Sequence, residues 1–452
     1  MTLELNGSSV KPAGIPKWLV ALVDISLANL GIYFSFVIFT GELQGFQIGP
    51  LVILLPAVSV VTVLLFSSLG LYSRQRSGFT PVVRALITGV LGLFLFTIIF
   101  AFMTRAFLFQ RMVFIVAPLL QFMLLLGWRI LFWRLELWIH GQQKILVIGR
   151  IEDVDQALDK LMHLPKGLFE VVKVLDPQKT DQLRDWLPVV DAVMIAGPIE
   201  MEDKNRIIRA SFDINREVFI IPELYEIILT RAAMTQVHDM PVIECRDLQL
   251  TFYQLFLKRT FDLSAALLLA VPALPLLALT ALAVRFSSPG PVIYSQERVG
   301  LRGRFFTLYK LRTMIADAEE GSGPVFSTEE DDRVTKVGRF LRATRLDELP
   351  QLYNVLRGDI SIVGPRPERP YFVEKFTSEM PDYSLRHLVK PGITGLAQVA
   401  GFYATNTRDK LRYDLYYLSD YSLLLDFRIL LLTVPTLFNR EAAKGVSRQA
   451  TE

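Results

Sequence analysis

Long apolar blocks near the N-terminus constrain this chain more than any other feature of its sequence. A helix needs about 20 apolar residues to cross a bilayer, and four blocks reach that length, at 18–40, 48–71, 82–103 and 107–133. They predict an α-helical four-span membrane bundle over residues 1–140.

Basic residues between the blocks predict how the bundle is oriented. Arg74, Arg76 and Arg84 lie in the second connection and Arg129 and Arg134 follow the fourth block, whereas the first connection has no basic residue. Lysine and arginine accumulate on the cytoplasmic side of a membrane. Both ends of the bundle are therefore expected in the cytoplasm.

Asp24 is a charged residue inside the first block. Such a residue is either functional or faces the bundle interior, where it pairs with a neighbouring helix.

The next region has the pattern of a parallel α/β domain. Short strand-like runs alternate with helical stretches over 141–245, which predicts a Rossmann-like fold. A dinucleotide fingerprint needs three glycines, but only Gly149 is present, and Glu152 and Asp153 would face the pyrophosphate. We therefore expect a structural or regulatory domain without a working phosphate loop, and its surface predicts a homodimer.

The charge balance and the cysteine count each exclude some kinds of partner or site. The chain has 48 Lys and Arg against 45 Asp and Glu, and no clustered basic face, so we expect no nucleic acid partner. The single cysteine, Cys245, excludes an intrachain disulfide framework and a cysteine-based zinc site.

A fifth apolar segment, 257–286, contains Pro272 and Pro275 in its middle. Each proline removes a backbone donor and crowds the preceding turn, so the pair favours a sharp bend. Basic residues flank both ends, namely Lys258, Arg259 and Arg285. This pattern predicts a re-entrant hairpin that enters and leaves on the cytoplasmic side, and a kinked fifth span is the alternative.

The remainder of 250–452 reads as an α+β catalytic domain, and its most informative residues are the adjacent carboxylates Asp347 and Glu348. If the stretch after them is helical, Pro350 lies near the helix start and both carboxylates lie in or just before the first turn. Mg²⁺ bound by one carboxylate and by substrate phosphates would offset their repulsion. An acidic helix start that caps free amides is the alternative.

Cations surround this pair in the sequence. Lys310 and Arg312 lie upstream, Arg342 lies just before the pair, and Arg366 is held between two prolines. Arginine suits phosphate oxygens. Next to an apolar hairpin, this composition predicts chemistry on a phosphorylated nucleotide at the surface of the lipid bilayer.

Several ordered motifs carry a resemblance to a known family. From residue 257 onward, "KRTFDL", "SPGPVIYSQERVGLRGRFFTLYKLRTM", "LRATRLDELPQLYNVLRGDISIVGPRPE", "KPGITGLAQV" and "DLYYLSDYSLLLD" occur in family order. The segment resembles the bacterial sugar transferases, the monotopic phosphoglycosyl transferases. With its bundle and α/β domain, the chain resembles the larger polyprenyl-phosphate hexose-1-phosphate transferases.

The resemblance implies a reaction and a site. A UDP-sugar, with glucose or galactose, would donate a sugar 1-phosphate to polyprenyl (undecaprenyl) phosphate and release UMP, which starts exopolysaccharide, capsule or O-antigen repeat units on the cytoplasmic face of the bacterial inner membrane. By the same resemblance Asp347 is the nucleophile that forms a phosphosugar–aspartyl intermediate, and Glu348 binds Mg²⁺. The substrate-binding positions would be Lys310, Arg312, Arg342, Arg366 and Asp414.

The chain departs from the family pattern after "GLAQV", where Phe402 stands at the place of a common arginine. Arg408 or Arg412 could substitute for it. A non-enzymatic membrane scaffold for polysaccharide assembly is the alternative function, and it predicts that changes to the carboxylate pair leave the surface polysaccharide unaltered.

Overall fold

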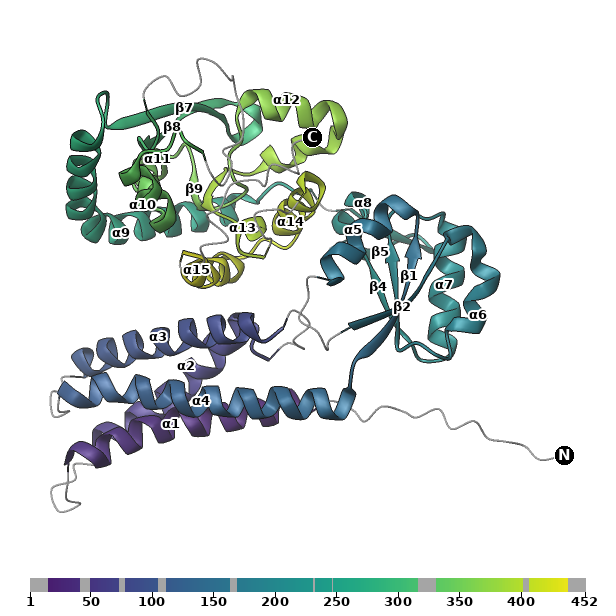
Figure 1. Ribbon diagram of the computed structural model, residues 1–452, viewed down its shortest axis with the longest axis horizontal. Helices are drawn as coiled ribbons and strands as arrows, with labels where there is room; N and C mark the ends of the chain where they lie inside the picture. Colours follow the sequence, from purple (N-terminus) through teal and green to yellow (C-terminus); the bar gives the residue numbers. More distant parts are fainter. Residues whose placement is uncertain are drawn as a thin grey trace. The chain divides into compact units, whose positions relative to one another are not determined.

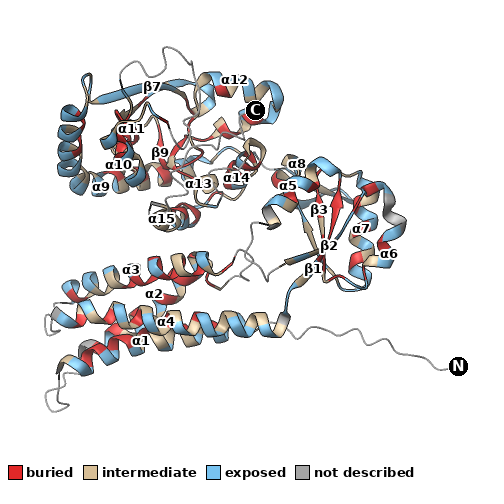
Figure 2. Ribbon diagram, viewed as in Figure 1, coloured by how far each residue is buried: buried red, intermediate tan, exposed pale blue. Residues whose placement is uncertain are grey.

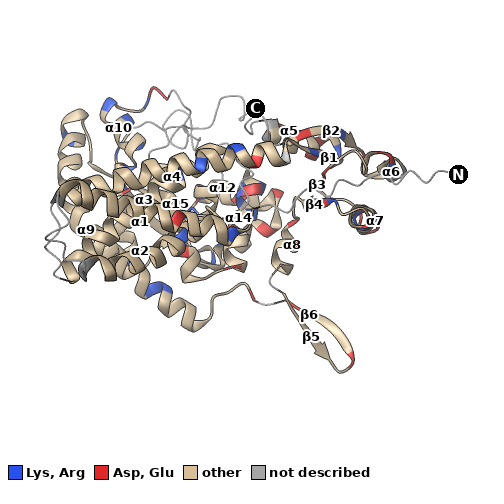
Figure 3. Cartoon of the chain, turned by 90° about the horizontal axis from the view of Figure 1, so that it is seen from below, with Lys and Arg blue, Asp and Glu red and all other residues tan. Residues whose placement is uncertain are grey.

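The computed structural model describes residues 15–40, 49–72, 78–104, 111–162, 169–230, 232–245, 247–315, 331–400 and 406–437. Each N-terminal apolar block forms a helix: α1 (Lys17–Thr40), α2 (Gly49–Ser68), α3 (Phe79–Met103) and α4 (Arg111–His140). With α9 (Phe252–Ser287), the described residues contain five helices long and apolar enough to cross a membrane. Figure 3 shows these helices almost free of charged residues.

Asp24 lies inside the group formed by α1–α4 and is fully buried. It accepts a hydrogen bond from Arg129 of α4, whose guanidinium also donates to the carbonyl of Leu71 at 3.0 Å. The expectation that Asp24 pairs with a neighbouring helix is confirmed. The prediction that Arg129 follows the fourth membrane segment is wrong, because Arg129 lies within α4, which continues to His140. Arg74 and Arg76 lie outside the described residues.

The middle region forms a parallel sheet, as the strand pattern predicts. Its strands are β1 (Gln143–Gly149), β2 (Phe169–Leu175), β3 (Ala192–Ala196) and β4 (Glu217–Ile220), in the order β2-β1-β3-β4. The helices around it are α5 (Ile151–Met162), α6 (Leu183–Trp186) and α7 (Met201–Asp213) (Figure 1). The residues of β1 and β3 are mostly buried (Figure 2), which explains their continuous apolar runs.

An acidic side chain lies at the strand ends of this sheet. Gly197, just after β3, has φ +83, and a Cβ at this position would overlap the carboxylate of Asp153. A carboxylate repels a pyrophosphate, but the expectation of a sheet without a working phosphate loop stays a prediction.

Contacts divide the chain into two compact units, Met1–Ile221 and Pro222–Glu452. The second unit begins with α8 (Leu224–Leu229) and an antiparallel hairpin of β5 (Ala233–Val237) and β6 (Met240–Glu244). The predicted domain boundary between 245 and 250 stays a prediction.

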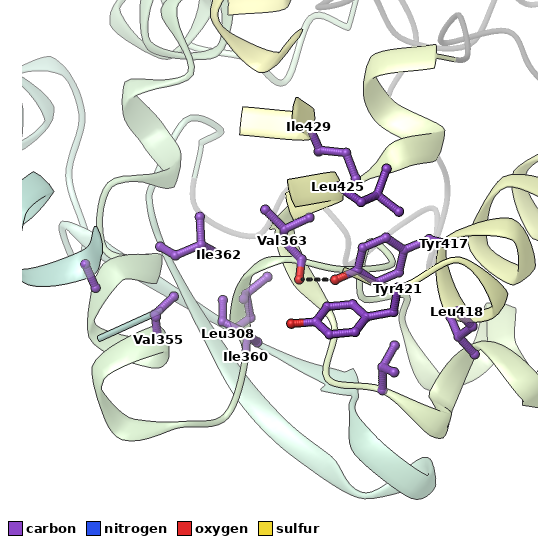
Figure 4. Packing of buried hydrophobic residues seen from close by; sticks show 12 residues of the cluster. Leu308, Val355, Ile360, Ile362, Val363, Tyr417, Leu418, Tyr421, Leu425 and Ile429 are labelled. Atoms are coloured by element: carbon purple, nitrogen blue, oxygen red, sulfur yellow. Dashed lines mark hydrogen bonds between the residues drawn. The ribbon is translucent and has the colours of Figure 1, made fainter. Parts of the chain in front are cut away.

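The second unit is mostly helical with two further short sheets. β7 (Ile293–Val299) pairs antiparallel with β8 (Phe305–Leu311), and β9 (Ser361–Val363) pairs parallel with β10 (Gly392–Thr394). The helices after α9 are α10 (Lys336–Thr344), α11 (Gln351–Arg357), α12 (Pro370–Glu379), α13 (Leu396–Ala400), α14 (Thr407–Ser419) and α15 (Leu423–Leu437). Figure 4 shows a core cluster to which α11, α14 and α15 contribute, and in it the Tyr417 hydroxyl donates to the carbonyl of Val363 at 3.3 Å.

Both arms of α9 pack against this unit. Near its start, Lys258 donates to Asp426 at 2.8 Å and to the carbonyl of Val363 at 2.9 Å. Near its end, Val284 lies in a core cluster with Leu311 and Leu341.

Between these contacts α9 is exposed and bent. Leu268 and Val271 are 75% and 73% exposed, and Pro272 and Pro275 lie inside the helix beside them. Figure 1 shows the two arms of α9 running in different directions. The helix therefore leaves the unit and returns to it.

Candidate active site

Asp347 and Glu348 lie on a tight 3-10 turn, η4 (Leu346–Glu348), between α10 and α11. Arg345 joins the end of α10 to this turn, and it has φ 57 in the left-handed region. This conformation costs a non-glycine residue about 1–2 kcal/mol. Pro350 then precedes α11, where its missing N–H removes no helix bond. The carboxylates thus lie just before a helix, as expected from the position of the proline.

Glu348 is held between two cations. Lys310 Nζ, from β8, and Arg366 Nη2, from the turn after β9, contact the same oxygen, Oε1, at 3.1 and 2.9 Å. Burial by itself raises the pKa of Glu348, but the charges of Lys310 and Arg366 outweigh it and hold this pKa well below its ordinary range. Glu348 is therefore ionised throughout the physiological range.

Asp347 has a different environment although it is the next residue. Its side chain is buried, and Oδ1 has no hydrogen-bond partner among the described residues. Burial, then the neighbouring charge of Glu348, raise the pKa of Asp347 to about 6, against the opposing charges of Lys310 and Arg342. At neutral pH this side chain is mostly an ionised carboxylate, which is the form that a nucleophile requires.

The space beside Glu348 suits an anion. A small hollow is lined by Arg298, Leu308, Lys310, Gln351, Arg366 and Pro367. Three of these six side chains are cations, and phosphate oxygens are their usual partners.

One carboxylate oxygen at the site fits a magnesium ion that arrives with a phosphorylated substrate. Both cations contact Oε1 of Glu348, and among the described residues its Oε2 accepts no hydrogen bond. The same residues contain no group of three Asp, Glu, His or Cys side chains that could hold a metal. Mg²⁺ commonly uses one or two carboxylates together with substrate phosphates and water.

Two further predicted site residues, Arg342 and Arg312, form hydrogen bonds with groups other than Glu348. Arg342 Nε donates to Thr313 Oγ1 at 2.9 Å, and its charge acts on Asp347. Arg312 donates to the carbonyls of Ser288 and Pro289 at 2.7 and 2.8 Å, so it binds the backbone that follows α9. Its assignment to the substrate stays a prediction.

Asp414 pairs with an arginine that the sequence did not single out. Asp414, on α14, accepts from Arg386 Nε at 2.9 Å, and both side chains are buried. Burial lowers the pKa of Arg386, but the charges of Asp414 and Tyr383 raise it above its ordinary range. Arg386 also donates to the carbonyl of Arg366 at 2.9 Å, which connects Asp414 indirectly to Glu348.

The two arginines proposed as substitutes at the family's arginine position are engaged elsewhere. Arg408 pairs with Glu223 at 2.8 Å, and Arg412 Nε donates to the carbonyl of Pro222 at 2.8 Å. Both contacts hold the segment that leads into α8 against α14. Phe402 itself lies outside the described residues.

Comparison with known proteins finds a matching family and several relatives. The bacterial sugar transferase family matches residues 253–440. A UDP-glucose:undecaprenyl-phosphate glucose-1-phosphate transferase of Escherichia coli (strain K12) is 35% identical over 325 residues, which cover 67% of this chain and 70% of that protein.

Other relatives match a shorter part of the chain. A UDP-N-acetylgalactosamine-undecaprenyl-phosphate N-acetylgalactosaminephosphotransferase of Aeromonas hydrophila is 45% identical over 193 residues, which cover 42% of this chain and 45% of that protein. The match thus spans less than half of the Aeromonas protein. An uncharacterized sugar transferase of Bacillus subtilis (strain 168) is 40% identical over 198 residues, which cover 44% of this chain but 95% of that protein.

Proposed function

Because the chain belongs to the bacterial sugar transferase family, we propose that it transfers a sugar 1-phosphate from a UDP-sugar to undecaprenyl phosphate and releases UMP. The observation that carries the proposal is the contrast between two adjacent carboxylates. Glu348 is fixed by two cations, whereas Asp347 is buried and keeps a free oxygen. The reaction would start glycan repeat units, with a hexose as the transferred sugar.

In the first step, an oxygen of Asp347 attacks the phosphorus atom that bears the sugar. The bond between this phosphorus and the bridging oxygen to UMP breaks, and UMP leaves with the electron pair. Lys310 and Arg366, which contact Glu348, would offset the negative charge on the phosphates. The carboxylate needs no deprotonation at neutral pH, since its pKa is about 6.

In the second step, a phosphate oxygen of undecaprenyl phosphate attacks the same phosphorus and releases Asp347 as a carboxylate. Two steps allow the soluble donor and the lipid acceptor to use the site in turn. Glu348 would hold Mg²⁺, which supplies charge neutralisation for the phosphates when it is bound.

We also propose that α9 is a re-entrant hairpin that brings the lipid phosphate to the site. Both of its arms contact the same unit, and between them lie exposed apolar residues such as Leu268 and Val271. A helix that crossed the bilayer completely would separate its ends by about 30 Å of hydrocarbon. The unit would then lie on the cytoplasmic face of the inner membrane, where nucleotide donors are present.

The test uses the purified full-length chain in detergent with undecaprenyl phosphate, Mg²⁺ and a panel of UDP-sugars that includes glucose, galactose and N-acetylgalactosamine. UMP release with one donor, lost in Asp347→Asn and kept in the exposed control Asp382→Asn, is the expected result. Full activity of Asp347→Asn would refute the assignment of the nucleophile. Absence of UMP release across the panel is the result that the scaffold alternative predicts.

A further inference from the structure

The turn Pro365–Glu368, which carries Arg366, receives the hydrogen bonds to its backbone carbonyls from outside the turn. Pro365 and Pro367 have no N–H, so the turn has few donors with which to bond itself. Its four successive carbonyls each accept a hydrogen bond from a different donor outside the turn. These donors are Gly392 N at 2.9 Å, Arg386 Nη2 at 2.9 Å, Arg298 Nη1 at 3.0 Å and Val299 N at 3.0 Å.

Two of the four donors are arginine side chains, and each is itself fixed. Arg386 is buried, where it pairs with Asp414 and donates to the hydroxyl of Tyr383 at 2.6 Å. Arg298, on β7, donates to Gln296 Oε1 at 2.6 Å and lies 3.6 Å from the carboxylate of Glu368. The two guanidinium groups hold adjacent carbonyls, those of Arg366 and Pro367.

The position of Arg366 depends on this turn. Its side chain is partly exposed, and its guanidinium reaches Glu348 Oε1. A long side chain on an unsupported turn would sample many orientations, since burying or fixing it costs up to about 2 kcal/mol of conformational entropy. Fixing the backbone on both sides of the Cα limits that freedom.

We propose that Arg298 and Arg386 are positioning residues that clamp the turn and thereby hold the Arg366 guanidinium against Glu348. Asp414 then acts on the reaction only through Arg386 and does not bind the substrate. The proposal rests on the proposed transferase function for its kinetic test. Lysine keeps the charge at these positions but lacks the planar fork that bonds a carbonyl and a carboxylate together.

The test measures kcat for the two clamp variants, Arg386→Lys and Arg298→Lys, and for Arg366→Lys. Each clamp variant is also combined with Arg366→Lys in a double variant. The exposed Arg304→Lys, on the same β7–β8 hairpin as Arg298, is the matched control. Misplacing a catalytic group by about 1 Å can cost about 100-fold in rate, so we expect each clamp variant to lower kcat by about 10- to 100-fold. In the Arg366→Lys background the same clamp substitution should lower kcat by less than about threefold, because sites that act through a shared partner are not additive.

Equal losses in both backgrounds, or a wild-type kcat in Arg386→Lys and Arg298→Lys, would overturn the clamp. Melting temperatures of all variants show whether a loss reflects unfolding. If Arg386→Lys does not fold, Tyr383→Phe removes one Arg386 contact and keeps the ring, and it should show the same dependence on Arg366. If the wild type releases no UMP, the proposed function fails, and melting temperatures then test the clamp. The clamp is refuted if the melting-temperature shift of the double variant equals the sum of the shifts of Arg386→Lys and Arg366→Lys.

Discussion

Replacing Asp347 by asparagine should abolish transfer and at the same time stabilise the fold. The folded protein keeps this carboxylate buried beside the charge of Glu348, which raises its pKa from an ordinary value of 3.8 to about 6. At about 1.4 kcal/mol for each pH unit between the two values, the ionised side chain costs the folded state about 3 kcal/mol at neutral pH. Asparagine has a similar shape and no charge, so it removes this cost.

The sign of the effect follows from proton binding. Because the folded state holds the proton of Asp347 more tightly, the stability of the wild type falls as the pH rises between 3.8 and about 6. Below this window both states are protonated and the cost is absent. The stability difference between Asp347→Asn and the wild type should therefore be complete above about pH 7, about half as large at pH 5, and small near pH 4.

The assay is thermal unfolding of the purified protein in detergent at pH 7.5 and pH 5. In a domain of about 200 residues, 1 kcal/mol shifts the melting temperature by roughly 2–4 °C. We therefore expect Asp347→Asn to melt about 6–12 °C higher than the wild type at pH 7.5.

Glu348→Gln is the matched control, because it removes the adjacent carboxylate, whose pKa is lowered rather than raised. The charges of Lys310 and Arg366 keep the pKa of Glu348 low, so its ionised form stabilises the fold above its ordinary pKa, and neutralising it removes the charge that both cations contact. This variant should melt below the wild type. Shifts of the same sign for the two variants, or a lower melting temperature for Asp347→Asn, would refute the contrast between the carboxylates.

Three further predictions follow from the structure. Transfer requires ionised Asp347, so UMP release should fall about tenfold for each pH unit below about 6, and an acid limb near pH 4 would contradict the role of burial. Arg129→Leu leaves Asp24 buried and unpaired, which should cost about 3–5 kcal/mol of stability; adding Asp24→Asn should restore much of the melting temperature, whereas additive losses would argue against the pair. Chelation of Mg²⁺ by EDTA should stop UMP release without changing the melting temperature of the nucleotide-free protein, and a large melting shift would instead indicate a resident ion.

Local sequence patterns predicted the elements that depend on neighbours in the chain. The apolar blocks form long helices, the alternating runs form a parallel sheet, and the turn with Asp347 and Glu348 lies directly before a helix. These features follow from periodicity and from proline, which act over a few residues. The family resemblance, carried by ordered motifs, is likewise confirmed by the relatives.

Pairings between distant residues were not predictable in the same way. Nothing near Asp414 indicates that its partner is Arg386, 28 residues earlier, and nothing near Asp24 indicates Arg129, 105 residues later. A charged residue in a motif looks the same whether it faces a substrate or a buried counter-charge. Arg312 illustrates this, because it lies among the phosphate-suited cations but binds backbone carbonyls after α9.

The return of α9 to the unit it leaves has a consequence for how such genes change. The long apolar helix belongs to the same stretch of coding sequence as the carboxylate pair, and its two arms are held by residues encoded after it. A deletion or recombination event that removed the first unit would remove α1–α4 and still leave α9 joined to the carboxylate pair. The membrane-length helix that stays with Asp347 and Glu348 is therefore inherited together with them.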